Sequence, residues 1–143
     1  MSIKQLTVFV ENRQGALVQI TDLLAANHVD MRALSIADTQ DFGILRLIVN
    51  DNDEALRVLQ SGGFLVQATD VIAVKISDTP GKLSSALHAL NVHGINVEYL
   101  YAFITRTARH AYVVLRVTDN DAASAVLEEA GFHMVSEEDI KKL

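Results

Sequence analysis

One residue pattern occurs twice in this 143-residue chain. The segment Asn12-Arg13-Gln14-Gly15-Ala16-Leu17 follows an apolar run, and Asp78-Thr79-Pro80-Gly81-Lys82-Leu83 follows another, with the two glycines 66 positions apart. The same offset relates residues 28–31 to residues 94–97, and an offset of 68 relates residues 61–64 to residues 129–132. An internal repeat of this length predicts two similar domains, which we place at residues 1–70 and 71–143.

The composition limits the partners of the chain. Its 18 Asp and Glu residues outnumber its 12 Lys and Arg residues, which gives a net charge of −6. Because phosphate contacts need clustered Lys and Arg, this balance argues against nucleic acids and anionic membranes. The chain has no cysteine, no apolar run long enough to span a membrane, and no basic N-terminal segment followed by an apolar one. We therefore expect a soluble cytoplasmic protein without disulfides or thiolate chemistry.

Each copy is predicted to contain a strand, a helix, two strands, a helix and a strand. In the first copy we expect strands at 6–10, 31–37, 44–49 and 64–68, a hairpin turn at 39–43, and helices at 17–27 and 51–61, the second ended by Gly62 and Gly63. In the second copy we expect strands at 72–76, 97–104, 111–117 and 133–135 and helices at 82–92 and 122–129.

Two short segments complete this prediction. Residues 69–71 are expected to be a short joint between the two copies. The segment Ser136-Glu137-Glu138-Asp139 resembles a capping box that opens a terminal helix, with Ile140 and Leu143 as its apolar contacts. Two βαββαβ units, each with helices on one face of an antiparallel sheet, make an α+β protein of ferredoxin-like architecture. Such a fold does not by itself identify a function.

The two repeated turns resemble the N/D-x-P-G-x-L signature of ACT domains, at the position between first strand and first helix where that family has it. Asp30 and Asn96 stand where the family begins its second strand. The resemblance implies a regulatory, non-catalytic protein that binds an amino acid, commonly at the interface between two domains placed side by side. With no recognisable enzyme domain beside it, the chain looks like a stand-alone tandem ACT protein that acts on an unidentified regulated protein. We expect a homodimer, and no cofactor or metal.

The physics of the turns supports a site for an amino acid. A turn that enters a helix offers free N–H groups and a positive dipole end to a carboxylate, and Gly15 and Gly81 have no Cβ to obstruct it. The ligand's ammonium group needs oxygen acceptors. The expected ligand-binding residues are the two turns and the two strand starts: Asn12, Arg13, Gly15, Ala16, Leu17, Asp30, Met31, Asp78, Gly81, Lys82, Leu83, Asn96 and Val97.

Two arrangements of these acceptors are open. If each site takes its turn from one domain and its strand start from the other, Asn12 is paired with Asn96 and Asp78 with Asp30. The first pair suits a neutral amino acid, whereas two carboxylates repel unless a cation or proton compensates, so unequal occupancy is expected. Pairing within each domain, Asn12 with Asp30 and Asp78 with Asn96, predicts nearly equivalent sites.

The first repeat departs from the family pattern at two positions. Gln14 replaces proline, which costs only preorganisation of the turn. His28 replaces glycine, and we interpret it as a surface histidine at a helix end in preference to a residue that selects the ligand side chain. His88 and His93 are five positions apart on one helix, a spacing that does not align two metal ligands.

An alternating aromatic stripe distinguishes the second copy. Tyr99, Tyr101 and Phe103 fall on one face of a strand, while their counterparts in the first copy are small residues. Exposed aromatic patches are usually covered, so this stripe predicts a sheet-face contact or a homodimer surface in preference to a ligand-stacking site.

Three other functions were weighed. RNA-binding RRM domains share the element order, but residues 43–49 and 111–117 lack the aromatic RNP1 pattern. A small enzyme using Asp30, Asp78 and His28 for acid and base steps lacks a nucleophile, a phosphate loop and a metal motif. A purely structural module that dimerises without a ligand is the main rival to the amino-acid sensor.

Overall fold

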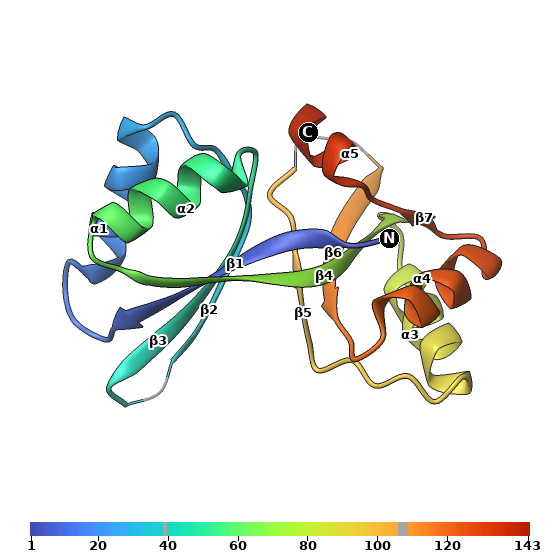
Figure 1. The fold of residues 1–143 in the computed structure, drawn as a ribbon. Helices are drawn as coiled ribbons and strands as arrows, with labels where there is room; N and C mark the ends of the chain where they lie inside the picture. Colours follow the sequence, from blue (N-terminus) through green and yellow to red (C-terminus); the bar gives the residue numbers. More distant parts are fainter. Residues whose placement is uncertain (39, 106–108) are drawn as a thin grey trace. The chain divides into compact units, whose positions relative to one another are not determined.

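The structure, a computed structural model, describes residues 1–38, 40–105 and 109–143 (Figure 1). It divides into two compact units, Lys4–Thr69 and Asp70–Leu143, the latter together with Met1–Ile3. The elements along the chain are β1 (Ile3–Glu11), α1 (Ala16–Ala26), β2 (Met31–Asp38), β3 (Phe42–Val49), α2 (Asn52–Ser61), β4 (Leu65–Ser77), α3 (Lys82–Val92), β5 (Tyr99–Ala102), β6 (His110–Arg116), α4 (Asn120–Glu129), β7 (His133–Met134) and α5 (Glu137–Lys142).

The unit Lys4–Thr69 contains a sheet with the strand order β2-β3-β1-β4. Strand β3 is antiparallel to both β1 and β2. Helices α1 and α2 lie on one face of this sheet (Figure 1). Alternate residues of β1, Leu6, Val8 and Val10, point into the core beneath the helices. Helix α1 contributes Ala16, Ile20 and Leu24, which are four positions apart and share one face of the helix.

The unit that contains Asp70–Leu143 repeats this plan. Its strands are ordered β5-β6-β4, with β7 also pairing with β4, and α3 and α4 contact each other. Buried Ala86 and Leu90 of α3 are the counterparts of Ile20 and Leu24 of α1 at the offset of 66. The predicted α+β, ferredoxin-like architecture in two copies is confirmed.

The short joint expected at residues 69–71 carries the last strand of the first copy straight into the first strand of the second. Strand β4 continues without interruption for 13 residues from Leu65 to Ser77. The reason is visible in the residues, because Thr69 and Val71 are β-branched and the segment contains no glycine or proline to end a strand. The predicted turn at 39–43 is also shorter, since β3 already begins at Phe42; Thr39 lies outside the described residues.

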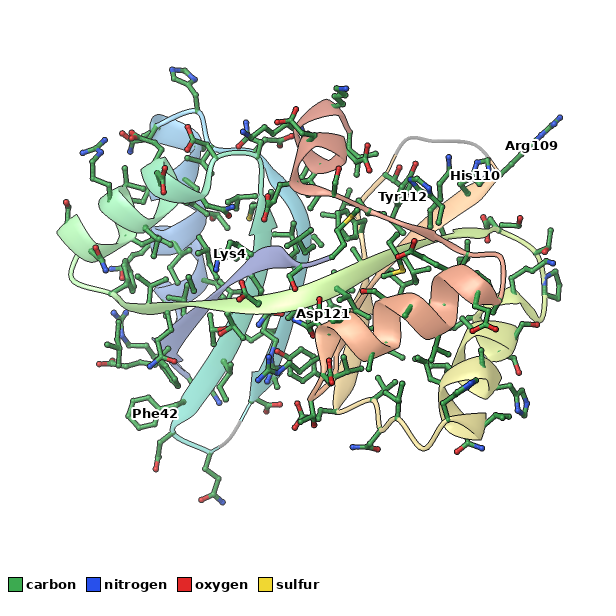
Figure 2. All side chains as sticks on the ribbon, turned by 45° about the vertical axis from the view of Figure 1, so that its right-hand side comes forward. Lys4, Phe42, Arg109, His110, Tyr112 and Asp121 are labelled. Atoms are coloured by element: carbon green, nitrogen blue, oxygen red, sulfur yellow. The ribbon has the colours of Figure 1, made fainter. Side chains whose placement is uncertain are left out.

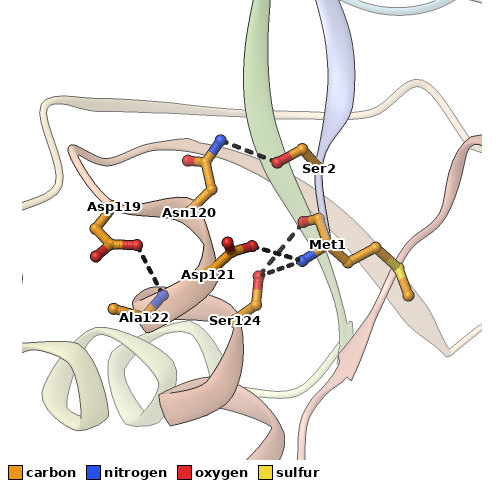
Figure 3. Close-up of polar contacts among 7 residues, drawn as sticks. All are labelled: Met1, Ser2, Asp119, Asn120, Asp121, Ala122 and Ser124. Carbon is orange, nitrogen blue, oxygen red and sulfur yellow. Dashed lines mark hydrogen bonds and ion pairs between the residues drawn. The ribbon is translucent and has the colours of Figure 1, made fainter.

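The first residues of the chain pack against the start of α4 (Figure 3). The buried hydroxyl of Ser124 accepts a hydrogen bond from the Met1 amino group at 3.3 Å and donates one to the Met1 carbonyl at 3.4 Å. Nearby, Asn120 Nδ2 donates to Ser2 Oγ at 3.1 Å. These contacts place Met1–Ile3 in the same unit as Asp70–Leu143; the domain limits 1–70 and 71–143 stay a prediction.

The terminal helix α5 begins with the predicted capping box. Ser136 Oγ accepts from the Asp139 N–H at 3.1 Å, and the Asp139 carboxylate accepts from the Ser136 N–H at 3.0 Å. Ile140, the predicted apolar contact, is fully buried. Hydrogen bonding with Ser136, chiefly through its backbone N–H and then through its side chain, holds the pKa of Asp139 below its usual range, with lesser contributions from His133 and Lys142.

The aromatic stripe is not an exposed patch. Tyr101 and Phe103 are only 8% and 7% exposed within the single chain. Phe103 contacts Tyr112 of β6, with ring centroids 6.0 Å apart, and Tyr99 lies 6.4 Å from Tyr101. Because two of its three rings are already buried, the stripe offers little surface to a second copy, and it no longer supports the predicted homodimer.

Candidate functional site

The two repeated turns adopt the same unusual backbone conformation. Gly15 immediately precedes α1 with φ +86°, and Gly81 immediately precedes α3 with φ +89°. This left-handed region is costly for residues with a Cβ, so glycine is required by the backbone at both positions. A Cβ built at either glycine meets no atom of the described chain within 4 Å. The space above both turns is therefore open, and a ligand can approach the backbone there.

Helices α1 and α3 begin without a side-chain cap, unlike the other helices. Asp51 caps α2 by accepting from the Glu54 N–H, and Asp119 caps α4 by accepting from the Ala122 N–H. The capping box of Ser136 and Asp139 serves α5. At α1 and α3 the preceding residue is a glycine, which has no side chain to accept a hydrogen bond. The first helix of the repeat is thus left without a side-chain cap in both copies.

Two N–H groups at each uncapped end have no hydrogen-bond acceptor among the described residues. In the first turn of α1, the Ala16 N–H donates to Arg13 O at 3.3 Å and the Gln19 N–H to Gly15 O at 3.2 Å. Within the described residues, no acceptor is recorded for the N–H groups of Leu17 and Val18, and both side chains are exposed. The first turn of α3 matches this arrangement, with Leu83 and Ser84 in the equivalent positions. Each turn therefore presents two free donors at the positive end of a helix dipole.

Asn12 and Asp78 are fixed next to these turns by equivalent backbone bonds. The Asn12 N–H donates to Asp41 O at 3.0 Å, and the Asp78 N–H donates to Arg109 O at 2.7 Å. Asp41 precedes β3 and Arg109 precedes β6. Each turn is therefore anchored to the start of the third strand of its own copy.

Asp30 and Met31 lie at the other end of β3. The Asp30 N–H donates to Asn50 Oδ1 at 2.8 Å, and the Asn50 N–H donates to Asp30 O at 3.1 Å. Asn50 directly follows β3, which is eight residues long, so about 26 Å of strand separates Asp30 from the turn at Asn12. The Asp30 carboxylate is also occupied by an ion pair with Arg32.

The second copy has the same separation. The Glu98 N–H donates to Arg116 O, the last residue of β6, whereas Asp78 is bonded to Arg109 before the first. Asn96 and Val97 precede Glu98, so the seven residues of β6, or about 23 Å, separate them from the turn at Gly81. The alternative that pairs Asn12 with Asp30 and Asp78 with Asn96 within each domain is therefore excluded.

His28 follows α1 with φ +57°, and its counterpart Gly94 follows α3 with φ +72°. The histidine therefore occupies a left-handed position at which the other repeat has glycine. Its side chain is exposed, in agreement with a surface histidine at a helix end. Because α1 is 11 residues long, about 16 Å, His28 lies far from the turn of its own copy.

Sequence reasoning missed a pocket beside each turn. The first, of about 400 Å³, is enclosed by the end of β1, the start of α1 and the segment after α2; its lining is Phe9, Val10, Glu11, Arg13, Ala16, Gln19, Phe42, Gly62, Gly63, Phe64 and Leu65. The second, of about 340 Å³, is lined by Lys75, Ile76, Ser77, Lys82, His110, Ala130, Gly131, Phe132 and His133. Of the predicted site residues, Arg13 and Ala16 line the first and Lys82 the second. The Gly63-Phe64 segment and its repeat Gly131-Phe132, which line the two pockets, were the sequence signal for this shared feature.

A family model for the ACT domain pair matches residues 1–143. The chain belongs to the ACT domain pair family. The family membership that the two turns indicated is confirmed. Both turns lie between the first strand and the first helix of their copy, as the resemblance implied.

Solved structures resemble this ACT domain pair over nearly its whole length. Protein BT0572 from Bacteroides thetaiotaomicron is 37% identical, with a TM-score of 0.92 over 100% of this chain and 98% of its own. The regulatory subunits of aspartate kinase from Thermus thermophilus and Thermus flavus are 15% and 17% identical, with TM-scores of 0.64 and 0.61. They cover 90% and 89% of this chain and 91% of their own, and at this identity they show the fold alone. No curated protein sequence matches the chain.

Two further properties of the ACT domain pair were tested on its described residues. Among residues 1–38, 40–105 and 109–143, no group of three or more His, Asp or Glu side chains is placed to hold a metal ion. No helix in the same part of the chain has both the length and the apolar character needed to cross a membrane.

Proposed function

We propose that this ACT domain pair is a non-catalytic amino-acid sensor whose ligand binds through its carboxylate at the start of α1 or α3. The observation that carries the proposal is the pair of uncapped helix starts after Gly15 and Gly81. In every other helix of the described chain, an Asp or Ser side chain at the N-cap accepts a hydrogen bond from the N–H of the third helical residue, and α1 and α3 lack such a cap. A carboxylate is the group that two free N–H donors at a helix N-terminus bind best.

The remaining predicted residues have separate roles in this proposal. Asn12 and Asp78 supply oxygen acceptors for the ammonium group beside the turn of their own copy. The two strand starts lie too far from the turn of their own copy to contact a ligand bound there. In this proposal they contact only a ligand bound at the turn of a different domain; these residues are Asp30, Met31, Asn96 and Val97. Since Asp78 carries a charge that Asn12 does not, the two turns are expected to differ in ligand preference and occupancy.

Regulation follows from the family and from physical linkage. A bound amino acid stabilises the arrangement that binds it better, and an unidentified partner protein responds to that arrangement. The absence of cysteine remains our reason to place the protein in the cytoplasm.

Thermal unfolding in the presence of each of the twenty amino acids tests the proposal. A ligand that binds only the native state at 100 times its dissociation constant adds about 2.7 kcal/mol of stability. We expect millimolar concentrations of one or a few amino acids to raise the Tm by several degrees. If none of the twenty changes the Tm, the structural module without a ligand becomes the better account.

Variants of the turns test the site itself. Asn12→Ala and Asp78→Ala should weaken binding of the active amino acid by different factors, because the two turns carry different acceptors. Asn91→Ala and Asp22→Ala, which remove the same groups from exposed positions on α3 and α1, are the matched controls and should leave binding unchanged. Equal effects of Asn12→Ala and Asp78→Ala would contradict unequal sites.

We also propose a homodimer, formed at the edge strand β2. Strand β2 ends the order β2-β3-β1-β4, and its apolar residues Leu34 and Ile36 are 42% and 46% exposed. Long apolar edges are normally covered, and a second copy of the same strand covers one by pairing with it. Sedimentation analysis should find a dimer for the natural chain and a monomer for Ile36→Lys. A monomeric natural chain at micromolar concentration would contradict this arrangement.

A further inference from the structure

The pocket beside α3 is lined by more basic side chains than the equivalent pocket beside α1, whose Arg13 is paired with Glu11. At four corresponding positions, Phe9, Ala16, Phe42 and Leu65 of the first pocket are replaced by Lys75, Lys82, His110 and His133 in the second. Figure 2 shows Phe42 near the end of its hairpin and His110 at the start of β6. The chain as a whole is acidic, with a net charge of −6. The pocket beside α3 is therefore a local cluster of basic residues on an acidic protein.

Strand register brings most of these groups to one face of the sheet. Lys75 and Ser77 are two residues apart on β4 and therefore point the same way. Lys75 is directly opposite His133 of β7, and Ser77 is directly opposite His110 of β6. Lys82, in the first turn of α3, completes the pocket from the helix side.

The acidic neighbours of the pocket neutralise little of this charge. Within residues 1–38, 40–105 and 109–143, Lys75, Lys82 and His110 form no ion pair. His133 has a carboxylate near it, since its Nε2 lies 3.8 Å from Asp139 Oδ2. Asp78 follows Ser77 in the chain but does not line the pocket. A bound anion complements basic side chains that have no carboxylate partner.

We propose that this pocket binds a small phosphate-bearing molecule. A phosphate group concentrates about two negative charges and three acceptor oxygens at one point, which matches two lysines, two histidines and the Ser77 hydroxyl converging on one space. The volume of about 340 Å³ is within the range of small-molecule pockets, so an organic group attached to the phosphate has room as well. This site goes beyond the amino-acid sensor, because its defining residues Lys75 and His133 are not part of either turn.

Titration with inorganic phosphate and with pyrophosphate tests the proposal, with amide NMR shifts as the readout. In the natural chain, the amides of Lys75, Lys82 and Gly131 should shift on titration. Those of Phe9, Ala16 and Gly63, the equivalent positions of the first pocket, should not shift, which makes the first copy an internal control. Shifts spread equally over both copies, or no shifts at all, would overturn the proposal even without any variant.

Variants locate the site more sharply. Lys75→Gln and His133→Gln should each weaken pyrophosphate binding by about tenfold, whereas Lys4→Gln on β1 should leave it unchanged. Succinate, a dicarboxylate of the same charge as a phosphate monoester, should bind more weakly than phosphate; equal binding of succinate would contradict the phosphate class. The amino acid found by thermal unfolding should bind Lys75→Gln normally, so the failure of one proposal is distinguishable from the failure of the other.

Discussion

At the residue scale, the backbone at a few positions decides which residues the repeat tolerates. Gly15 and Gly81 share a left-handed conformation in open space, so their glycines serve the turn and leave room above it. His28 and Gly94 share another left-handed position, but only one copy has glycine there. His28, at which the first copy departs from the family pattern, therefore introduces backbone strain. It lies at the opposite end of α1 from the turn.

This pair gives a direct prediction of stability. His28→Gly should stabilise the protein by up to about 1 kcal/mol, because a residue with a Cβ pays roughly that amount to adopt a left-handed conformation. Gly94→Ala should destabilise it by a similar amount, since the built Cβ meets no atom and only the backbone strain remains. Urea unfolding measures both changes. Two shifts of the same sign would contradict the explanation.

At the scale of elements, the sequence predicted most helices and strands well because their signals are local. The predicted helix at 82–92 has the bounds of α3, and Asp51 and Ser136 open their helices as expected. The sequence placed a short joint at residues 69–71, and the β-branched residues there continue β4 through it. The two pockets were missed because they depend on side chains that strand register, and not sequence spacing, brings together.

The capping box of α5 predicts a dependence of stability on pH. The pKa of Asp139 is lowered in the folded protein, chiefly by its hydrogen bond from the Ser136 N–H. Such a group stabilises the fold above the ordinary aspartate pKa, and the contribution is lost as the pH falls through the folded value. Asp139→Asn should therefore cost less than about 1 kcal/mol near pH 7, since the carboxylate is partly exposed. The cost should shrink below about pH 4; a cost that grows on acidification would contradict this sign.

At the scale of the whole molecule, duplication followed by divergence explains the function that we propose. Both copies keep the glycine turn, the uncapped helix start and a pocket beside it. Four lining positions that are apolar in the first copy (Phe9, Ala16, Phe42 and Leu65) carry basic residues in the second (Lys75, Lys82, His110 and His133). In our proposals, one fold that is repeated once carries two binding sites of different chemistry. The resemblance to the ACT family implies that such binding of small molecules serves regulation.

The most direct measurement of the central claim follows the backbone amides by NMR during titration with the amino acid that raises the Tm most. The account predicts that the amides of Leu17 and Val18, or of Leu83 and Ser84, shift strongly as the carboxylate accepts their hydrogen bonds. The amides of Glu54 and Ala122, which Asp51 and Asp119 already cap, should stay in place. Strong shifts elsewhere, with all four uncapped amides unmoved, would contradict the account.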